Sequence, residues 1–388
     1  MKLFSRKDAT IIFLTVPMIL EYCATNGKRL SGKFSEDPIL NSKEEGLDSP
    51  ILMAINVGIT APNPHNTQAW KFKIISPTEA NLYVDEKRIL PLTDPSTRQI
   101  HIGQGTFLEV LKIGATKLGY EAKIKLLPEG DYKQEEIGKK PIANIKLVSN
   151  TSTVHELFES IKERRTDRSI YIGENITEAE FQKVLKFGNA ENSEIKFLPK
   201  SNGSENLQRI FFESMKLETK TIKRADESRT WFRFSDKEIQ TKRDGIALPD
   251  QGVTGFTRWM LETFLMSSDP KDFHNDKGTD MFLAKYKDKI DSQKGIVYWK
   301  TKTNTRKDWI LVGMDYARFH LALTKEGLTM HPLSQALQEY PEMDALRKEL
   351  EVALDTKSNE KVQMISRLGR SDYRYFTPRR SPKEMIVS

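Results

Sequence analysis

The sequence is almost free of cysteine and contains no recognisable metal-binding pattern. Its single cysteine, Cys23, cannot form an internal disulfide, and no cysteine-based metal site or redox pair can be built. The six histidines show no HxxxH or HExxH spacing, so we expect no bound zinc or iron. There is also no long Lys/Arg block, because the 61 basic residues are interleaved with 54 acidic ones. The net charge of +7 therefore argues for a small anionic ligand rather than for nucleic acid.

Several common catalytic motifs are absent as well. The chain has no GxSxG nucleophile elbow and no Walker loop, and "GQGTFL" lacks the third glycine of a dinucleotide-binding GxGxxG. These absences argue against a serine hydrolase of the α/β type, a P-loop nucleotidase and a Rossmann dehydrogenase.

No hydrophobic run near the N-terminus is long enough to span a bilayer. Residues 1–24 combine a basic start (Lys2, Arg6, Lys7) with an apolar run from Ala9 to Leu20, which suits the core of a signal peptide. "SRKDA" resembles a twin-arginine export signal, and we expect export to the periplasm or cell envelope. Tyr22 occupies the place where cleavage needs a small residue, so an N-terminal helix on a cytoplasmic protein remains the alternative. Contact with a membrane is expected only through this segment, if it is retained.

The rest of the chain predicts two related halves. Residues 25–48 are polar and interrupted by Gly and Pro, which is typical of a linker. "WKFKII" and "ANLYVDE" alternate like two paired strands and precede a long helix that ends at Gly119. "GIVYWKTKT" is a further strand and precedes a second long helix that ends at Gly327. This repetition predicts a degenerate duplication with halves at 49–150 and 151–388, and residues 202–290 of the second half are expected to be mostly helical.

Two short segments carry unusual chemistry. "APNPHNTQAW", residues 61–70, places several hydrogen-bonding side chains between prolines that restrict the loop. "RRTDR", residues 164–168, follows a predicted helix in "TVHELFESIKE" and brings together three guanidinium groups and a hydroxyl, a set that binds phosphate well. An ordinary polar loop and a solvated basic helix end are the alternatives for the two segments taken separately.

Together the two segments resemble the flavin-binding motifs of the nitroreductase superfamily, in particular its Acg-like branch. The family motif RRSxR matches Arg164, Arg165, Thr166 and Arg168, and the motif APSxxNxQPW matches Ala61, Pro62, Asn66, Gln68 and Trp70. Asn63 replaces the family's serine and Ala69 its second proline. "SRLGRSDYRYFTPRR" is similar to the superfamily's C-terminal segment, with Arg379 and Arg380 at its basic positions. "MHPLSQ" is similar to the loop beside the flavin ring, which puts Ser334 near it.

This resemblance implies an α+β fold of nitroreductase type, in which two fused halves form a pseudo-dimer around one FMN site. It also implies a lid inserted at residues 202–290 of the second half, and core aromatic residues with an ordinary turn are the alternative for this segment. The residues it assigns to the cofactor are Pro62, Asn63, Asn66, Gln68, Arg164, Arg165, Thr166, Arg168, Arg379 and Arg380. It also implies an FMN-dependent oxidoreductase that transfers electrons from NADH or NADPH to a nitroaromatic, a quinone or a similar small acceptor. No protein acid or base is required, because the flavin carries the hydride. The alternative is an FMN-sequestering protein with little turnover, and either a monomer or a homodimer is expected.

Overall fold

The structure is a computed structural model that describes residues 42, 46–150, 153–201, 204–255 and 276–387, with four scattered positions at 258, 261, 269 and 274. The predicted signal-like segment and nearly all of the predicted linker lie outside these residues. Within the described part of the chain, no helix is long and apolar enough to cross a membrane.

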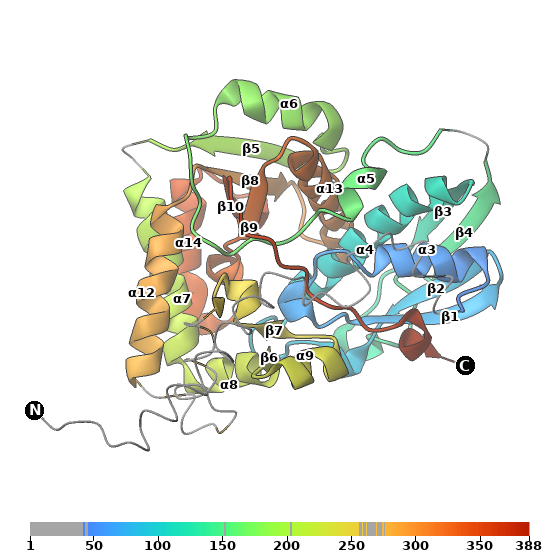
Figure 1. Cartoon of the computed structure of the whole chain (residues 1–388), viewed down its shortest axis with the longest axis horizontal. Coiled ribbons are helices and arrows are strands. Elements are labelled where there is room, and N and C mark those ends of the chain that lie inside the picture. The colour runs from blue at the N-terminus through green and yellow to red at the C-terminus, as the bar shows by residue number, and fades with distance from the viewer. Residues whose placement is uncertain are drawn as a thin grey trace, which may run out of the picture.

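Two β-sheets and the helices around them make a mixed α+β structure (Figure 1). The first sheet has the strand order β11-β1-β2-β4-β3, and its strands are Trp70–Ser76 (β1), Glu79–Val84 (β2), Tyr120–Leu126 (β3), Ala143–Ser149 (β4) and Ile386–Val387 (β11). The second has the order β5-β8-β10-β9, with strands Glu194–Pro199 (β5), Gly295–Thr301 (β8), Thr329–Pro332 (β9) and Lys361–Gly369 (β10). A short parallel pair joins Phe232–Arg233 (β6) to Ile246–Ala247 (β7).

The helices fall into two groups, one formed by a central pair (α4, Arg98–Lys117, and α13, Arg306–Lys325) with the helices that flank it, and one at the periphery. The flanking helices are Pro50–Gly58 (α3), Phe158–Ile161 (α5) and Glu178–Gly188 (α6). The peripheral ones are Glu205–Lys220 (α7), Ile222–Thr230 (α8), Asp236–Lys242 (α9), Asp276–Asp291 (α12) and Asp344–Ala353 (α14). Short 3₁₀ turns lie at 64–66 (η2), 86–88 (η3), 134–136 (η4), 249–251 (η5), 335–337 (η7), 341–343 (η8) and 382–385 (η9).

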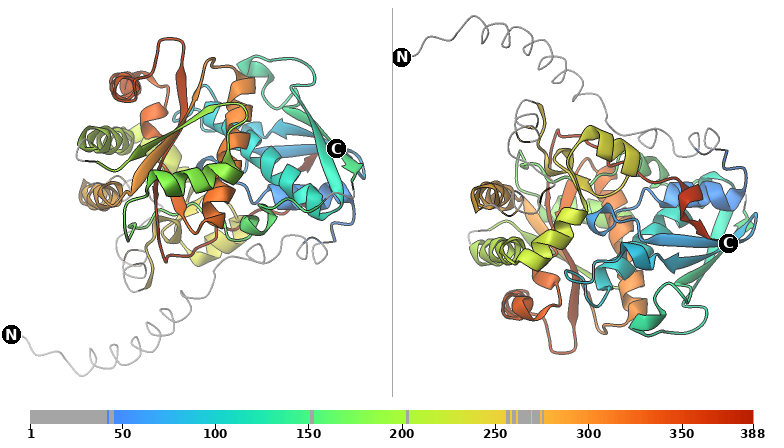
Figure 2. Two further views of the ribbon diagram at one scale, coloured as in Figure 1. Left: turned by 90° about the horizontal axis from the view of Figure 1, so that it is seen from above. Right: turned by 90° about the horizontal axis from the view of Figure 1, so that it is seen from below.

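Helices α4 and α13 form the centre of the molecule, between the two sheets (Figure 1). Apolar residues of both helices and of both sheets belong to one buried cluster. A second cluster lies between the second sheet and the helices α7, α12 and α14, which stand side by side on its outer face (Figure 2). Helices α7 and most of α12 come from residues 202–290, whereas α14 comes from a later part of the chain.

The two sheets repeat one arrangement. In each, a helix packed on the central pair (α3 or α6) precedes two strands, and a 20-residue helix (α4 or α13) separates the second strand from the last two. The order β1-β2-β4-β3 in the first sheet corresponds to the order β5-β8-β10-β9 in the second. Neighbouring strands within each of these orders are antiparallel. Strand β11 adds the C-terminus to the first sheet, parallel to β1.

Glycines allow the two central helices to touch at their backbones. A Cβ added to Gly105 in α4 would lie 1.8 Å from the carbonyl oxygen of Ile310, and one added to Gly313 in α13 would lie 2.0 Å from that of Ile102. These two contacts are reciprocal, since each glycine is the eighth residue of its helix and faces the isoleucine three positions before the other glycine. Such a symmetric contact is typical of an isologous interface.

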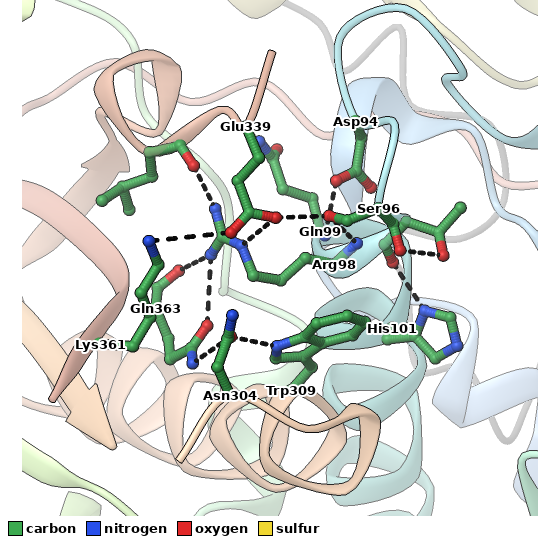
Figure 3. Close-up of polar contacts among 12 residues, drawn as sticks. Asp94, Ser96, Arg98, Gln99, His101, Asn304, Trp309, Glu339, Lys361 and Gln363 are labelled. Carbon is green, nitrogen blue, oxygen red and sulfur yellow. Dashed lines mark hydrogen bonds and ion pairs between the residues drawn. The ribbon is translucent and has the colours of Figure 1, made fainter. Parts of the chain in front are cut away.

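Arginines at the start of both central helices also cross between the halves. Arg98 is 1% exposed and donates from Nη1 to the carbonyl oxygen of Gln363 at 2.7 Å, and its Nε lies 3.7 Å from Glu339 (Figure 3). Arg306 in α13 lies 3.4 Å from Asp131 and over the ring of Tyr132, in the connection between β3 and β4. Each half therefore places one arginine against the other.

The predicted strands and both long helices are confirmed, whereas one predicted helix is much shorter than expected. Of "TVHELFESIKE" only Phe158–Ile161 is helical. At the end of this helix the carbonyl oxygen of Ser160 accepts hydrogen bonds from the N–H groups of Glu163 and Arg164. Residues 164–168 then have no regular secondary structure. The segment at 341–353 begins as a 3₁₀ turn at Pro341 and becomes α-helical at Asp344.

The helix crossing makes Gly105→Ala a severe change. Helix propensity alone would favour alanine by about 1 kcal/mol. A methyl group forced against a backbone carbonyl costs about 1–3 kcal/mol or more, because the helices must separate. We expect the free energy of unfolding, measured by urea titration, to fall by about 2 kcal/mol or more. Lys307→Ala, at an exposed position of α13, is the control and should change little. An unchanged or higher stability of Gly105→Ala would contradict the crossing.

Candidate functional site

The loop that follows α3 has an unusual backbone. His65, Asn66 and Gln68 have φ values of 47°, 51° and 51°, in the left-handed region that residues other than glycine seldom adopt. Such conformations cost about 1–3 kcal/mol each and persist only where the surroundings hold them. Their concentration within four residues indicates that the shape of this loop is needed.

Side-chain amides hold this backbone in place. The Asn63 side-chain oxygen accepts a hydrogen bond from the Gln68 backbone N–H at 2.8 Å. The fully buried Gln68 side chain accepts from the Arg380 N–H and donates to the Arg243 carbonyl oxygen, both at 2.8 Å. The Asn66 amide donates to the Pro378 carbonyl oxygen at 3.3 Å, which leaves its own oxygen buried without a partner among the described residues. The loop is thus fixed to two distant segments.

The arginine segment 164–168 lies against the end of α3. Arg164 is 7% exposed and donates from Nη2 to the Thr60 carbonyl oxygen at 2.7 Å, while its buried Nη1 has no hydrogen-bond partner among the described residues. Arg165 donates to the Tyr373 carbonyl oxygen at 2.8 Å. In the described part of the chain, Arg168 makes no hydrogen bond or ion pair, although its charge acts on several neighbours. Arg164 and Arg168 therefore retain donors for a ligand.

The C-terminal segment brings a further arginine to the same place. Arg379 donates from Nε to the carbonyl oxygen of Ile59 at 2.8 Å and from Nη2 to those of Thr60 and Ala61 at 3.3 Å. Its Nη1 bonds the carbonyl oxygens of Thr377 and Pro378. These carbonyl groups include the negative end of the α3 dipole, which a cation stabilises. Arg379 thus supplies positive charge, but its donors are already used.

These three segments surround one cavity of about 60 Å³. We call it the arginine cavity, and its lining includes the polar residues Thr60, Asn63, Asn66, Arg164, Arg165, Thr166, Arg168, Asp250, Thr377 and Arg379, with Pro62, Ile161, Lys162, Ile246 and Phe376. Since a single buried water needs about 10–15 Å³ on this measure, the space is large enough for more than one water. That size suits a phosphate group, and it is too small for a flavin ring.

The cavity has an excess of buried positive charge. Four arginines line it, against the single carboxylate of Asp250. Burial lowers the pKa of Arg164 to about 10, and burial together with the nearby charge of Arg164 lowers the pKa of Arg379 to about 9. Both shifts mean that the charged forms are destabilised by their surroundings, so an anion in the cavity would be bound favourably.

The structure brings together most of the residues that the sequence assigns to a ligand. Those that line the cavity are Pro62, Asn63, Asn66, Arg164, Arg165, Thr166, Arg168 and Arg379. Gln68 and Arg380 do not line the cavity. The Arg380 side chain instead donates to the Glu384 carbonyl oxygen at 3.0 Å. Ser334 is half-buried at the start of η7 and does not line the cavity.

Some lining residues were not among the candidates. Thr60, Asp250 and Thr377 contribute polar groups to the wall, and Phe376 contributes a buried ring. Asp250 lies in the segment "RDGIALPDQGVTG", about 80 residues from the arginine segment, and no local pattern ties the two together. Phe376 and Thr377 could have been proposed as lining residues from the sequence, because they lie close to Arg379 in the chain.

Comparison with known proteins gives partial likenesses to nitroreductases. No family model matches the chain. Rv3131 of Mycobacterium tuberculosis, provisionally named an NAD(P)H nitroreductase, is 30% identical over 119 residues, which are 30% of this chain and 33% of that protein. The uncharacterised Rv3127 of the same organism is 30% identical over 120 residues, with the same coverage. The chain thus spans about a third of the length of the curated relatives it matches.

The solved structures to which the chain is similar include flavin enzymes. The FMN-dependent nitroreductase NfnB from Mycobacterium smegmatis, solved with NADPH, is 15% identical, with a TM-score of 0.38 over 59% of this chain and 96% of that one. A provisionally assigned nitroreductase from Anabaena variabilis is 12% identical, with a TM-score of 0.40 over 75% of this chain and 69% of that one.

Replacing Gln68 tests whether its amide holds the loop. Gln68→Leu keeps the approximate volume but leaves the Arg380 N–H and the Arg243 carbonyl without their partner. We expect a loss of about 2–4 kcal/mol in the free energy of unfolding, because each unsatisfied buried group costs about 1–3 kcal/mol. Gln182→Leu, on the exposed face of α6, is the control. Equal stability of the two variants in urea titrations would show that the Gln68 amide carries no such role.

The same loop gives a pH prediction. Burial, and secondarily the Arg168 charge, lower the pKa of His65 from 6.5 to about 4. The unfolded chain therefore binds a proton that the folded chain excludes, so stability is complete above pH 6.5 and falls as the pH drops toward 4. We expect His65→Asn, which tolerates the left-handed backbone, to reduce this loss by about 2–3 kcal/mol in unfolding titrations at pH 7 and pH 4. An identical pH dependence of variant and wild type would contradict the prediction.

Proposed function

We propose that this protein binds FMN with its phosphate in the arginine cavity and acts as an FMN-dependent oxidoreductase of nitroreductase type. The observation that carries the proposal is the cavity itself, where Arg164 Nη1 and the whole of Arg168 retain donors beside the Thr166 hydroxyl. Phosphate oxygens accept several charge-assisted hydrogen bonds, and arginine is well suited to supply them. The unpartnered Asn66 oxygen is placed to accept from a hydroxyl of a bound sugar chain.

The wider assignment is supported by the residues first and by the relatives second. The motifs around Asn66 and Arg164 resemble those of the nitroreductase superfamily and its Acg-like branch, and a third of Rv3131 is 30% identical to this chain. On this proposal NADH or NADPH is the reductant, and a nitroaromatic, a quinone or a similar small molecule is the acceptor.

The protein's own part in such a reaction is binding and positioning. The arginines would hold the phosphate, and the strained loop at residues 62–66, fixed before any ligand arrives, would lower the cost of ordering the site. Bound FMN would supply the hydride chemistry. No residue of the cavity is needed as a catalytic acid or base on this proposal, because the flavin would carry the hydride.

A fused pseudo-dimer is part of the proposal. The equal strand order of the two sheets, the reciprocal contacts of Gly105 and Gly313, and the crossed arginines Arg98 and Arg306 support it. The arginine cavity takes its loop from residues 60–66 and its arginine segment from residues 164–168. One chain would thus form a complete site, as two subunits do in a homodimer.

A flavin-sequestering protein is the second candidate function, and one observation favours it. Residues 243–253, which we call the cover loop, close one side of the cavity through Ile246 and Asp250. The loop is tied down by the Gly245 N–H, which donates to the Asn66 carbonyl oxygen at 3.1 Å, and by the Tyr373 hydroxyl, which donates to that of Pro249 at 2.5 Å. A closed loop over the ligand would slow exchange with an external reductant.

Arg168→Leu tests the proposed site with little risk to the fold, since Arg168 makes no hydrogen bond within the described residues. We expect FMN to bind about 10- to 100-fold more weakly, as the loss of one or two charge-assisted hydrogen bonds implies. Arg374→Leu is the matched control, because this exposed arginine bonds Glu163 alone among the described residues and lies outside the cavity. Fluorescence titration with FMN gives the affinities. Equal affinity of the two variants for FMN would show that the arginine cavity does not bind this ligand.

A rate measurement separates the two functions. The purified protein with bound FMN is assayed with NADH or NADPH and either menadione or nitrofurazone. An oxidoreductase is expected to turn over well above the rate of the same concentration of free FMN. Oxidation of NADH or NADPH no faster than with free FMN would rule out the oxidoreductase and would favour the flavin-sequestering protein.

A further inference from the structure

The arginine cavity contains a carboxylate where an anionic ligand has to bind. Asp250 is 6% exposed, and it lines the same space as Arg164, Arg165, Arg168 and Arg379. Among the described residues, none of these arginines lies within ion-pair distance of its oxygens, so the cavity separates the carboxylate from the guanidinium groups. A phosphate bound in this cavity would meet the positive charges of four arginines and also the negative charge of Asp250.

Asp250 is held toward the cavity by neutral donors. Its Oδ1 accepts from the Thr377 hydroxyl at 2.8 Å, and its Oδ2 accepts from the Ala247 backbone N–H at 2.8 Å. Burial raises the pKa of Asp250, and the charges of Arg168 and Arg379 oppose that rise. The charges of Arg168 and Arg379 and the hydrogen bonds from Thr377 and Ala247 thus together compensate for the burial of this carboxylate.

The cover loop connects this carboxylate to both halves of the molecule. On one side the Arg243 carbonyl oxygen accepts from Gln68, and Asp244 pairs with Arg88 and Arg233. On the other side the Gln251 carbonyl oxygen accepts from Lys289 at 2.8 Å. Asp250 lies between these anchors, in the short turn η5. A movement of Asp250 therefore changes how the whole loop closes the cavity.

We propose that Asp250 is an internal counter-ion that competes with the phosphate of the ligand, so that phosphate binding releases the cover loop from its closed position. The proposal rests on the proposed function in naming a flavin phosphate as the ligand. Two negative charges within one small cavity repel each other strongly, because the effective dielectric constant there is far below that of water. Asp250 thereby sets how tightly the cavity retains a phosphorylated ligand.

Asp250→Asn tests the competition. The amide oxygen still accepts one of the two hydrogen bonds, whereas the charge is removed. Affinities of the full-length protein for FMN are measured by fluorescence titration, and those for inorganic phosphate by thermal shift. Asp372→Asn removes the same charge from an exposed side chain of the C-terminal segment and serves as the matched control. Asp250→Ser, which also keeps an acceptor for the Ala247 N–H, replaces the first variant if that one fails to fold.

We expect Asp250→Asn to bind both FMN and inorganic phosphate about tenfold more tightly than wild type or Asp372→Asn, as the loss of one like charge implies. Unchanged or weaker binding of both would overturn the proposal, since Asp250 would then be a bystander or a ligand contact. If no variant binds FMN but phosphate still binds more tightly to Asp250→Asn, the counter-ion proposal stands and the proposed function fails.

Hydrogen exchange gives an independent reading of the loop. In wild type, inorganic phosphate should accelerate exchange of the Ala247 amide, because its acceptor Asp250 leaves. Slower exchange at Ala247 on addition of phosphate would overturn the release of the cover loop.

Discussion

The backbone contact between α4 and α13 at Gly105 and Gly313 positions the two sheets and the segments that form the arginine cavity. Because neither helix carries a Cβ at the contact, their backbones touch, and the two sheets are held at a fixed separation on either side. Helix α3 packs on α4, and its last carbonyl groups point to the place where residues 164–168 pass. The arginine cavity exists because this packing brings the end of α3, the arginine segment and the C-terminal segment to one point.

Charge, rather than shape, determines what the cavity can bind. Arg164 and Arg379 stabilise the carbonyl groups at the end of α3, and they bring more positive charge than those groups neutralise. Arg168 adds a guanidinium group with no partner of its own among the described residues. The same electrostatics explain why Asp250 is tolerated in a buried position. Structure and binding are therefore coupled, because residues that hold α3 in place also create the attraction for an anion.

Local composition predicts the elements and much of the candidate site. Alternating apolar residues gave the strands, and helical periodicity gave the two long helices. The concentration of Asn, Gln and Pro at 61–70 and of Arg at 164–168 identified segments that the structure brings to one cavity. These are properties of neighbouring residues, so a single sequence contains them.

What the sequence could not predict depends on contacts between distant segments. Gln68 looks like a ligand residue, and its amide instead bridges Arg380 and Arg243. Arg379 looks like a phosphate ligand, although its donors bind the end of α3. Gly105 lies in "GQGTFL", which lacks the third glycine of a dinucleotide-binding motif. Its role in the contact with α13 becomes visible only in the folded structure. Asp250 faces the arginines across more than 80 residues of sequence, and no periodicity links them.

A comparison of FMN with riboflavin shows whether the arginine cavity holds the phosphate, because the two flavins differ only by that group. Both are titrated into the ligand-free, full-length protein under identical salt conditions, and the dissociation constants are compared. We expect FMN to bind at least about 100-fold more tightly than riboflavin, because its phosphate would accept two or more charge-assisted hydrogen bonds. Equal affinities, or no binding of either flavin, would contradict this expectation.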